Sequence, residues 1–189
     1  MEAKKMKKGL MLLADGFEET EAITTHDILS RTHEIDCVLA SISTSLEVKT
    51  SMGLVVKANC LVDEIKEDDF DFLVLPGGKV GVDNLKACPK AKELVLSFYK
   101  KSKGVYAICA APSILEELGL LKDKTFTCFP SFEGKTGKYQ KNAGAVADGN
   151  IVTGHSMAFT IPFAEEIVKK ECGEEAIKRI LPGTRGGIA

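Results

Sequence analysis

Cys109 stands at the point where a buried strand is predicted to turn into a helix. The apolar run Val105–Ile108 precedes it, and Ala111, Pro112 and the letters SILEEL follow. A thiol beside the free N–H groups of a helix start can have a lowered pKa and act as a nucleophilic thiolate. Free cysteines are also common as small, unreactive core residues, so the local pattern supports both interpretations about equally.

Three glutamates, Glu18, Glu19 and Glu21, open the predicted first helix. Acidic residues are favoured at helix N-termini, which explains one or two of them without any site. Glu18 and Glu21 are three residues apart and share a helix face, whereas Glu19 points away. A carboxyl buried beside a thiol has a raised pKa, and in its protonated form it donates a hydrogen bond to the thiolate. Either Glu18 or Glu21 can supply this carboxyl.

Two consecutive glycines follow another predicted strand, in the sequence LPGG at 75–78. Glycine pairs are common in tight turns, which is the simplest interpretation. Exposed backbone N–H groups at such a turn can also stabilise an oxyanion. The continuation GGKVG lacks the Lys-Ser/Thr of a phosphate-binding loop, so we do not expect nucleotide binding.

A histidine and a second cysteine also lie near predicted strand ends. His155 directly follows a strand at 150–154, which makes it a candidate base or substrate-orienting residue. Cys128 lies in a strand predicted over 125–129 and can be a resolving cysteine, although a core position is the favoured interpretation. The three histidines of the chain are widely separated, and we expect no metal site.

Strand-like and helix-like segments alternate along the chain and must position these groups. This alternation is typical of parallel βαβ units, and the apolar strands indicate a sheet covered on both faces. We therefore predict an α/β fold, an α/β/α sandwich with a mostly parallel central sheet, in one domain over 1–189. The predicted strands are 8–14, 35–42, 71–78, 104–108, 125–129 and 150–154, with a hairpin over 46–59 and a loop over 63–71; the helices are 18–31, 89–101, 111–120, 159–171 and 174–181.

Composition excludes several classes of function. The chain has 189 residues, of which 44% are hydrophobic, and a net charge of −2, so no basic excess favours nucleic acid or an anionic membrane surface. No apolar run approaches the roughly 18 residues of a membrane span. The six cysteines are scattered without CxxC pairs, and the N-terminal segment resembles a strand more than a signal peptide. We expect a cytoplasmic protein with reduced thiols.

Three motifs together resemble one known family. LLADGFEETEAITTHDIL, VLPGG followed by NL, and AICAAPSIL occur in this order, as in the ThiJ/PfpI superfamily. Within it, the chain is similar to the branch of the parkinsonism-associated protein deglycase and the bacterial YajL-type proteins, from about residue 8 to about residue 170. The resemblance implies a flavodoxin-like fold, a homodimer and chemistry without a cofactor.

The resemblance also implies roles for particular residues. Cys109 corresponds to the family's reactive cysteine, and Glu21 to its protonated glutamate partner. Gly78 and Ala110 correspond to the residues whose backbone N–H groups stabilise an oxyanion. Arg31 corresponds to a helix arginine that lies near the cysteine of the partner subunit.

The chain departs from the family pattern at several positions. Phe129 replaces a histidine of the human-type members, which removes a Cys-His dyad through that position. The letters HSMA at 155–158 replace an Arg/Gln-Gly-Pro-Gly loop, so His155 joins Phe129 and Arg31 as candidates for the pocket rim. Met52 replaces an arginine of the hairpin, and Ala110 replaces the histidine of the peptidase branch, which makes a Cys-His peptidase unexpected.

Two functional hypotheses follow. In the first, Cys109 adds to the carbonyl of a small 2-oxoaldehyde, or of its adduct on a protein, and the chain is a glyoxalase or deglycase. In the second, Cys109 is oxidised under stress with little turnover, and the chain is a redox sensor or a chaperone-like protein. The partners expected are a small aldehyde or a glycated protein and a second copy of the chain.

Overall fold

A seven-stranded sheet forms the centre of the molecule in the computed structural model, which describes residues 6–186. The strand order is β10, β11, β7, β6, β1, β2, β5, and every neighbouring pair is parallel except β10 with β11. The strands are β1 Lys7–Leu13, β2 Ile35–Ser41, β5 Cys60–Leu61, β6 Phe72–Leu75, β7 Gly104–Ile108, β10 Ala145–Asp148 and β11 Ile151–Gly154.

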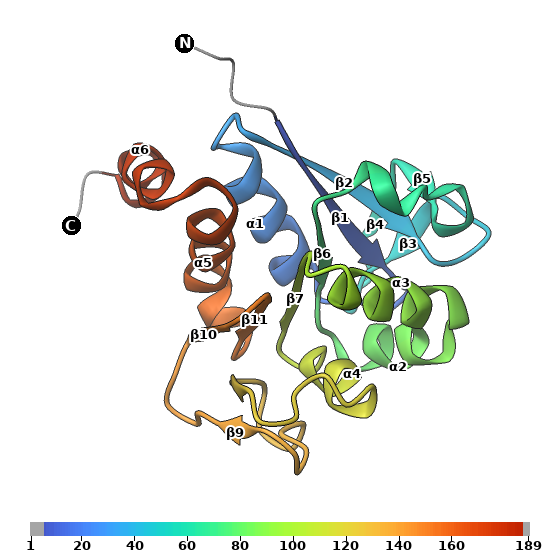
Figure 1. Ribbon diagram of the computed structural model, residues 1–189. Coiled ribbons are helices and arrows are strands. Elements are labelled where there is room, and N and C mark those ends of the chain that lie inside the picture. The colour runs from blue at the N-terminus through green and yellow to red at the C-terminus, as the bar shows by residue number, and fades with distance from the viewer. Residues whose placement is uncertain (1–5, 187–189) are drawn as a thin grey trace.

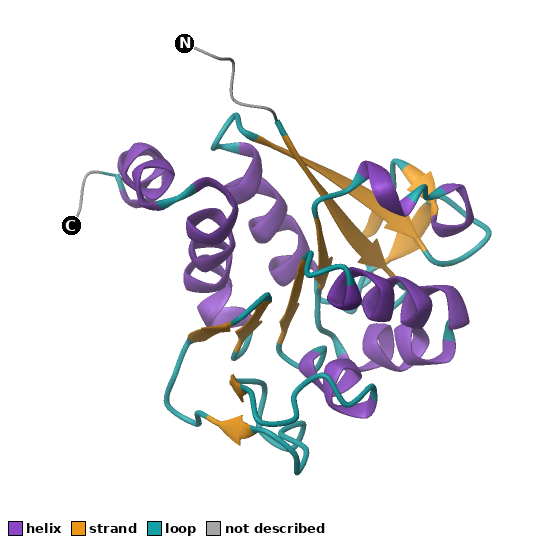
Figure 2. Ribbon diagram, in the orientation of Figure 1, coloured by secondary structure: helices purple, strands orange, loops and turns teal. Residues whose placement is uncertain are grey.

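Helices cover both faces of this sheet (Figures 1 and 2). Successive strand residues point to opposite faces, so Leu10 and Leu12 pack with one set of helices while Met11 and Leu13 pack with the other. The predicted α/β/α sandwich with a mostly parallel sheet is confirmed. One face carries α1 Glu19–Ser30, α5 Thr160–Cys172 and α6 Glu174–Arg185, and the other carries α2 Lys79–Ala87, α3 Pro89–Lys100 and α4 Pro112–Glu117.

The predicted hairpin is confirmed, and several short elements were not predicted. The hairpin consists of β3 Glu47–Lys49 and β4 Val55–Lys57 in antiparallel pairing. Two short 3-10 turns, Val62–Glu64 and Glu67–Asp69, occupy much of the region predicted as a loop over 63–71. The unpredicted helix is α2, and the unpredicted strands are β5, β10 and the short β9, Lys138–Tyr139. Helix α2 contains Gly81 and two weak helix formers, Asp83 and Asn84, which reduce its helical signal.

The prediction of a strand over 125–129 is wrong in length and in place. Only β8, Thr125–Phe126, is a strand, and it pairs with β9, Lys138–Tyr139, outside the central sheet. Residues 127–129 pass beside the end of β11 but do not form the backbone hydrogen bonds of a β-sheet with it. The backbone N–H of Thr127 donates instead to the Thr153 hydroxyl, at 2.9 Å.

The parallel strands bring four segments to one edge of the sheet. This is the edge at which the parallel strands β1, β6, β7 and β11 end. The residues that follow each of these strands therefore lie close to one another. The carboxyl edge of an open parallel sheet is where ligands usually bind. Among residues 6–186, no helix has the length and apolar character that a membrane crossing requires.

Candidate active site

Cys109 occupies a strained turn between β7 and the short helix α4. Its φ is 65°, a left-handed conformation that few residues other than glycine adopt. Its N–H donates to the Gly154 carbonyl at 2.9 Å, and its own carbonyl accepts the Phe129 N–H at 2.8 Å. The predicted turn from strand to helix is therefore present, and it holds the cysteine in a conformation that raises the free energy of the folded chain.

Glu21 places a buried carboxyl beside this thiol. The residue is 1% exposed, and its Oε2 accepts the backbone N–H of Gly77 at 2.8 Å. Oε1 is also buried and accepts no N–H or O–H within residues 6–186, while the Cys109 thiol interacts with the same carboxyl. Glu18, the alternative from the sequence, is the N-cap residue before α1, and its carboxylate accepts the Ser51 hydroxyl at 2.8 Å.

The glycine pair lets the backbone approach these side chains. A Cβ on Gly77 would lie 2.4 Å from the Glu21 Oε2 and 2.7 Å from the Cys109 Cβ. Gly78 has φ 88°, and a Cβ there would lie 2.5 Å from the Gly16 carbonyl oxygen. Both positions therefore require glycine. Sequence reasoning selected Gly78 and missed Gly77, although LPGG contains both.

The thiol and the carboxyl shift each other's titration. Burial raises the pKa of Glu21 to about 7. Burial, and then the negative charge of Glu21, raise the pKa of the Cys109 thiol to about 12, against the opposing effect of the Gly78 and Ala110 N–H groups. The lowered cysteine pKa expected from the helix start is therefore wrong in direction. The two groups instead titrate as a coupled pair that shares one proton over most of this range.

A cavity of about 300 Å³ opens onto the pair. Its size suits a small molecule. The sequence identified Phe129 and the 155–158 loop as rim candidates, and Phe129 and three residues of that loop do line the cavity. The lining residues are Glu18, Glu21, Gly78, Cys109, Phe129, Ser156, Met157 and Ala158.

His155 lies at the predicted edge, but its ring is used elsewhere. Its Nδ1 is 2.7 Å from the carbonyl oxygen of Cys128, and the ring stacks on Phe159 with centroids 5.6 Å apart. The residue is not among those that line the cavity, so this arrangement does not support a role as a base toward substrate. Cys128 is fully buried in the hydrophobic core, as the favoured interpretation held.

Arg31 lies at the far end of α1 from Glu21. It forms an ion pair with Asp27 at 2.6 Å and, with His33 and Arg179, lines a separate cavity of about 460 Å³. Within one chain it does not line the Cys109 cavity. Its expected position beside the cysteine of a partner subunit stays a prediction.

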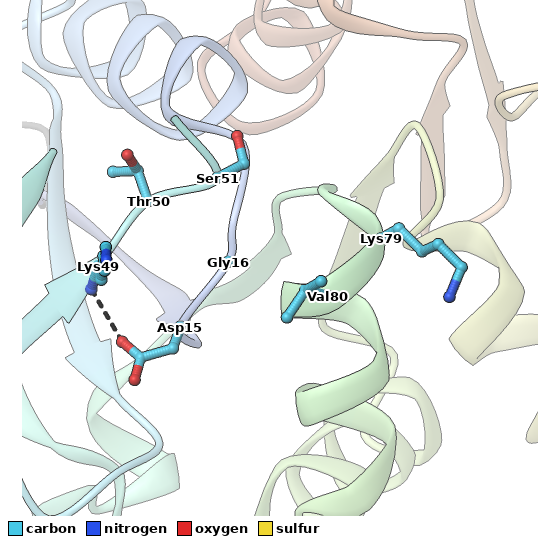
Figure 3. A pocket seen from close by; sticks show the side chains of 7 residues that line it. All are labelled: Asp15, Gly16, Lys49, Thr50, Ser51, Lys79 and Val80. Atoms are coloured by element: carbon cyan, nitrogen blue, oxygen red, sulfur yellow. Dashed lines mark hydrogen bonds between the residues drawn. The ribbon is translucent and has the colours of Figure 1, made fainter. Parts of the chain in front are cut away.

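A larger cavity, of about 480 Å³, is lined by the loop that follows β1, by residues 49–51 and by the start of α2 (Figure 3). In the wall of this cavity, the Asp15 carboxylate accepts a hydrogen bond from the backbone N–H of Lys49 at 2.8 Å. The Lys79 side chain points away from this pair. The lining contains neither a thiol nor a buried carboxyl, so the reactive groups lie in the smaller cavity. Within residues 6–186, no three His, Cys, Asp or Glu side chains are grouped to hold a metal ion.

Comparison with known proteins identifies the family. Residues 7–170 match the DJ-1/PfpI family. The chain belongs to the DJ-1/PfpI family. The resemblance that the motifs indicated is thereby confirmed.

Curated relatives of this DJ-1/PfpI protein span animals, plants and archaea. Protein dj-1beta of Drosophila melanogaster is 31% identical over 182 residues, 93% of this chain and 97% of the relative. A protein of Thermococcus kodakarensis named as a deglycase is 32% identical over 170 residues, 86% of this chain and 98% of the relative. DJ-1 homolog B of Arabidopsis thaliana is 34% identical over 168 residues, 88% of this chain but only 38% of that longer protein.

Solved structures of the family share the fold. Drosophila melanogaster DJ-1beta superposes with a TM-score of 0.90 at 28% identity, covering 95% of this chain and 98% of that one. A DJ-1 superfamily protein from Salmonella typhimurium gives a TM-score of 0.89 at 32% identity, covering 97% of this chain and 100% of that one. The flavodoxin-like fold predicted from the sequence is confirmed.

Proposed function

We propose that this protein is a cysteine-dependent, cofactor-free glyoxalase or protein deglycase that acts on 2-oxoaldehydes or their adducts on proteins. The observation that carries the proposal is the buried Glu21 carboxyl, whose Oε1 has no N–H or O–H partner within residues 6–186, beside the Cys109 thiol. Relatives from Thermococcus kodakarensis and Pyrococcus abyssi are named as deglycases, which supports this chemistry.

The first step uses the shared proton of the pair. The Cys109 sulfur forms a bond to the aldehyde carbon while its proton passes to Glu21. The carbonyl electrons move to oxygen, where the N–H groups of Gly78 and Ala110, which already interact with the sulfur, lie close enough to stabilise the charge. Glu21 then returns the proton to this oxygen. A carboxyl with a pKa of about 7 suits such transfer near neutral pH.

The second step is an internal oxidation and reduction of the substrate. Glu21 removes the proton from the sulfur-bound carbon and returns one to the neighbouring carbon, while the hydroxyl proton on the oxygen of the first carbon passes to the carbonyl oxygen of the second. The first carbon becomes a thioester and the second an alcohol, so no external oxidant is needed. Water then cleaves the thioester, which releases a 2-hydroxy acid and restores the Cys109 thiol.

The cavity favours a small uncharged carbonyl compound. Phe129 and Met157 supply apolar walls, and the charged residues of the lining, Glu18 and Glu21, are both acidic. Because no lysine or arginine is among the lining residues, the cavity offers no charged side-chain partner to an anionic substrate. A neutral aldehyde such as methylglyoxal meets these requirements.

The test measures consumption of methylglyoxal and formation of lactate by purified protein. Cys109→Ser should abolish turnover, and Glu21→Gln should reduce it at least 100-fold, since general acid–base groups contribute about 10²–10⁴-fold. Cys60→Ser is the matched control, because Cys60 lies in β5 outside the cavity, and it should retain activity. An inactive wild type, or full activity in Cys109→Ser, would refute the proposal.

A second candidate function is oxidation sensing. Oxygen atoms added to the Cys109 sulfur would find the Gly78 and Ala110 N–H groups and, when protonated, the Glu21 carboxyl as donors. A solved structure of Toxoplasma gondii DJ-1 at 26% identity is described as oxidized. Mass spectrometry after mild peroxide treatment tests this role: Cys109 should gain oxygen before Cys60, and equal oxidation would argue against a sensor.

We also propose that a second copy of the chain covers one apolar surface. Ile23 of α1 and Met52, Leu54 and Val55 of the hairpin are between 45% and 77% exposed. The hairpin contacts the start of α1, because the Met52 N–H donates to Glu19 at 3.3 Å. Light scattering should give a dimer mass for the wild type and a monomer mass for Val55→Glu. A monomeric wild type would refute the proposal.

A further inference from the structure

His155 connects the two backbone segments that hold Cys109. We propose that His155 is a positioning residue, which fixes the strained turn of the Cys109 nucleophile through the carbonyl of Cys128. Its expected effect on turnover rests on the proposed function, whereas its effect on Cys109 reactivity does not. Position 155 directly follows β11, and the histidine there begins the HSMA segment at 155–158.

A closed loop of hydrogen bonds carries the inference. The His155 Nδ1 lies 2.7 Å from the Cys128 carbonyl oxygen, and because a carbonyl only accepts, Nδ1 carries the hydrogen. The next residue, Phe129, donates its N–H to the Cys109 carbonyl at 2.8 Å. The residue before the histidine, Gly154, accepts the Cys109 N–H at 2.9 Å. His155 therefore joins the two partners of the Cys109 backbone.

The strained turn needs support from outside its own helix. A left-handed conformation at a cysteine persists only where the surroundings fix it. α4 begins at Pro112, and its six residues supply no hydrogen bond to the Cys109 N–H or carbonyl. Among the described backbone hydrogen bonds, those two groups are satisfied by Gly154 and Phe129. Movement of either partner would change where the sulfur points.

The segment over 127–129 has no strand ladder to hold it. Thr127 fixes its start, because its N–H donates to the Thr153 hydroxyl and its own hydroxyl lies 3.0 Å from the Gln140 carbonyl oxygen. At the end of the segment next to Cys109, the Cys128 carbonyl lies 2.7 Å from the His155 Nδ1 and 3.5 Å from the Tyr139 hydroxyl, so His155 supplies the shorter of its two hydrogen bonds.

One contact holds the imidazole ring of His155, and another holds its backbone. Its ring stacks on Phe159 at an interplanar angle of 17°, and the His155 backbone N–H donates to the Gly144 carbonyl at 2.9 Å. A ring held in this way can define the position of the Cys128 carbonyl. Because Phe129 also forms a wall of the cavity, His155 sets both the nucleophile and the surface against which a substrate rests.

The test compares three substitutions of His155. His155→Asn places an amide N–H near the position of Nδ1, His155→Gln places it one methylene farther out, and His155→Ala removes it. The readouts are the rate constant for alkylation of Cys109 by iodoacetamide, measured by peptide mass spectrometry, and kcat and KM for methylglyoxal. Loss of one hydrogen bond predicts that the Ala and Gln variants fall about 10-fold in alkylation rate and kcat.

His155→Asn should stay within about twofold of the wild type in both rates, because the donor is retained. His33→Asn is the matched control: it makes the same change at φ 54°, which asparagine tolerates, and His33 lies outside the Cys109 cavity. Phe129→Leu keeps the backbone bond but changes the wall, and should mainly raise KM.

Several outcomes decide between the two proposals. If the wild type does not turn over methylglyoxal but alkylation follows the order above, the proposed function fails and the positioning role stands. Equal alkylation in all His155 variants, or rescue by Gln as complete as by Asn, overturns the positioning role. If His155→Ala does not fold, the nitrogen shifts of His155 in the wild type replace it: hydrogen on Nδ1 is expected, and hydrogen on Nε2 alone overturns the proposal.

Discussion

Two glutamates, the buried Glu21 and the partly buried Glu171, lie toward opposite ends of β7 and differ in how their oxygens are paired. Glu21 meets Cys109 at the carboxyl end, whereas Glu171 accepts the hydroxyl of Tyr106, whose side chain reaches back toward Gly104. Burial is the largest cause of a raised pKa at both carboxyls. Glu171, however, also lies 3.6 Å from the Nζ of Lys7.

The comparison shows that burial alone does not make a reactive carboxyl. Both oxygens of Glu171 have a partner: one accepts the Tyr106 hydroxyl, and the other faces the Lys7 ammonium group. Both partners stabilise the carboxylate and so oppose the rise in pKa that burial causes. Glu21 has one backbone N–H and no cation, and its other oxygen is left without an N–H or O–H partner among residues 6–186. A shared proton with the adjacent thiol is the simplest way to satisfy that oxygen. The incomplete pairing therefore identifies the reactive end.

Gly77→Ala should have the largest effect, and only at the Glu21 end. The added Cβ would meet the Glu21 Oε2 at 2.4 Å and the Cys109 Cβ at 2.7 Å, so the pair must separate. Displacement by about 1 Å can cost about 100-fold in rate, and we expect this loss in methylglyoxal turnover. Gly183→Ala is the control, because its nearest contact would be an ordinary 3.9 Å. Wild-type activity in Gly77→Ala would contradict the proposed geometry.

Glu21→Gln should stabilise the fold in a pH-dependent way. The pKa of Glu21 is about 7 when folded against 4.5 as the reference for the unfolded chain, so its contribution to stability is full below pH 4.5 and is lost as pH rises through about 7. Relative to wild type, the variant should gain on the order of 3 kcal/mol between pH 4.5 and pH 8. Urea unfolding at both pH values measures this.

Glu171→Gln provides the contrast for that measurement. Its gain should be smaller, because Lys7 and Tyr106 stabilise the Glu171 carboxylate and so limit the rise of its pKa. If the free energy of unfolding of the two variants depends equally on pH, the inferred difference between the Glu21 and Glu171 carboxyls is contradicted.

Tyr106→Phe should destabilise the protein without changing the reactive pair. The substitution removes the hydroxyl that donates to Glu171 and leaves a largely buried carboxyl oxygen unpaired, which costs about 1–3 kcal/mol. Urea unfolding measures the loss, and Tyr99→Phe on α3 is the control. Alkylation of Cys109 should remain at the wild-type rate, and a fall in that rate would show that the two ends are coupled.

Lys7→Met should have the smallest effect. The Lys7 side chain is 39% exposed and lies 3.6 Å from Glu171 and 3.7 Å from Asp71. Such partly exposed pairs contribute about 0–1 kcal/mol, and added salt weakens them. Unfolding in low and high salt should show a small difference from wild type that shrinks with salt. A loss of several kcal/mol would show that Glu171 depends on its cation more than we infer.

The sequence predicted the elements with strong apolar patterns and missed those without them. The long central strands were predicted because buried parallel strands form continuous apolar runs, and the hairpin was predicted because its residues alternate around Met52-Gly53. α2 was missed because Gly81 is retained for packing: a Cβ there would lie 2.7 Å from the Phe17 Cα. The strand over 125–129 was predicted too long because the apolar letters continue past β8, while residues 127–129 bond to side chains and turns.

The candidate site was predicted in part. Cys109 followed from its place between strand and helix, but only the family resemblance selected Glu21 over Glu18. The direction of the thiol pKa could not be read from the sequence, because it depends on burial and on the distance to Glu21 after folding. His155 was expected to face the substrate, and its bond to the Cys128 carbonyl depends on a segment whose path had no local signal.

The most direct test of the shared proton is the pH dependence of Cys109 alkylation in wild type and Glu21→Gln. In a coupled pair, reactivity of the sulfur follows the first proton lost from the pair, whichever atom carries the second. We predict that the wild-type rate rises with a step near pH 7 and that this step disappears in Glu21→Gln. Superimposable profiles for the two proteins would contradict the pairing of Cys109 with Glu21.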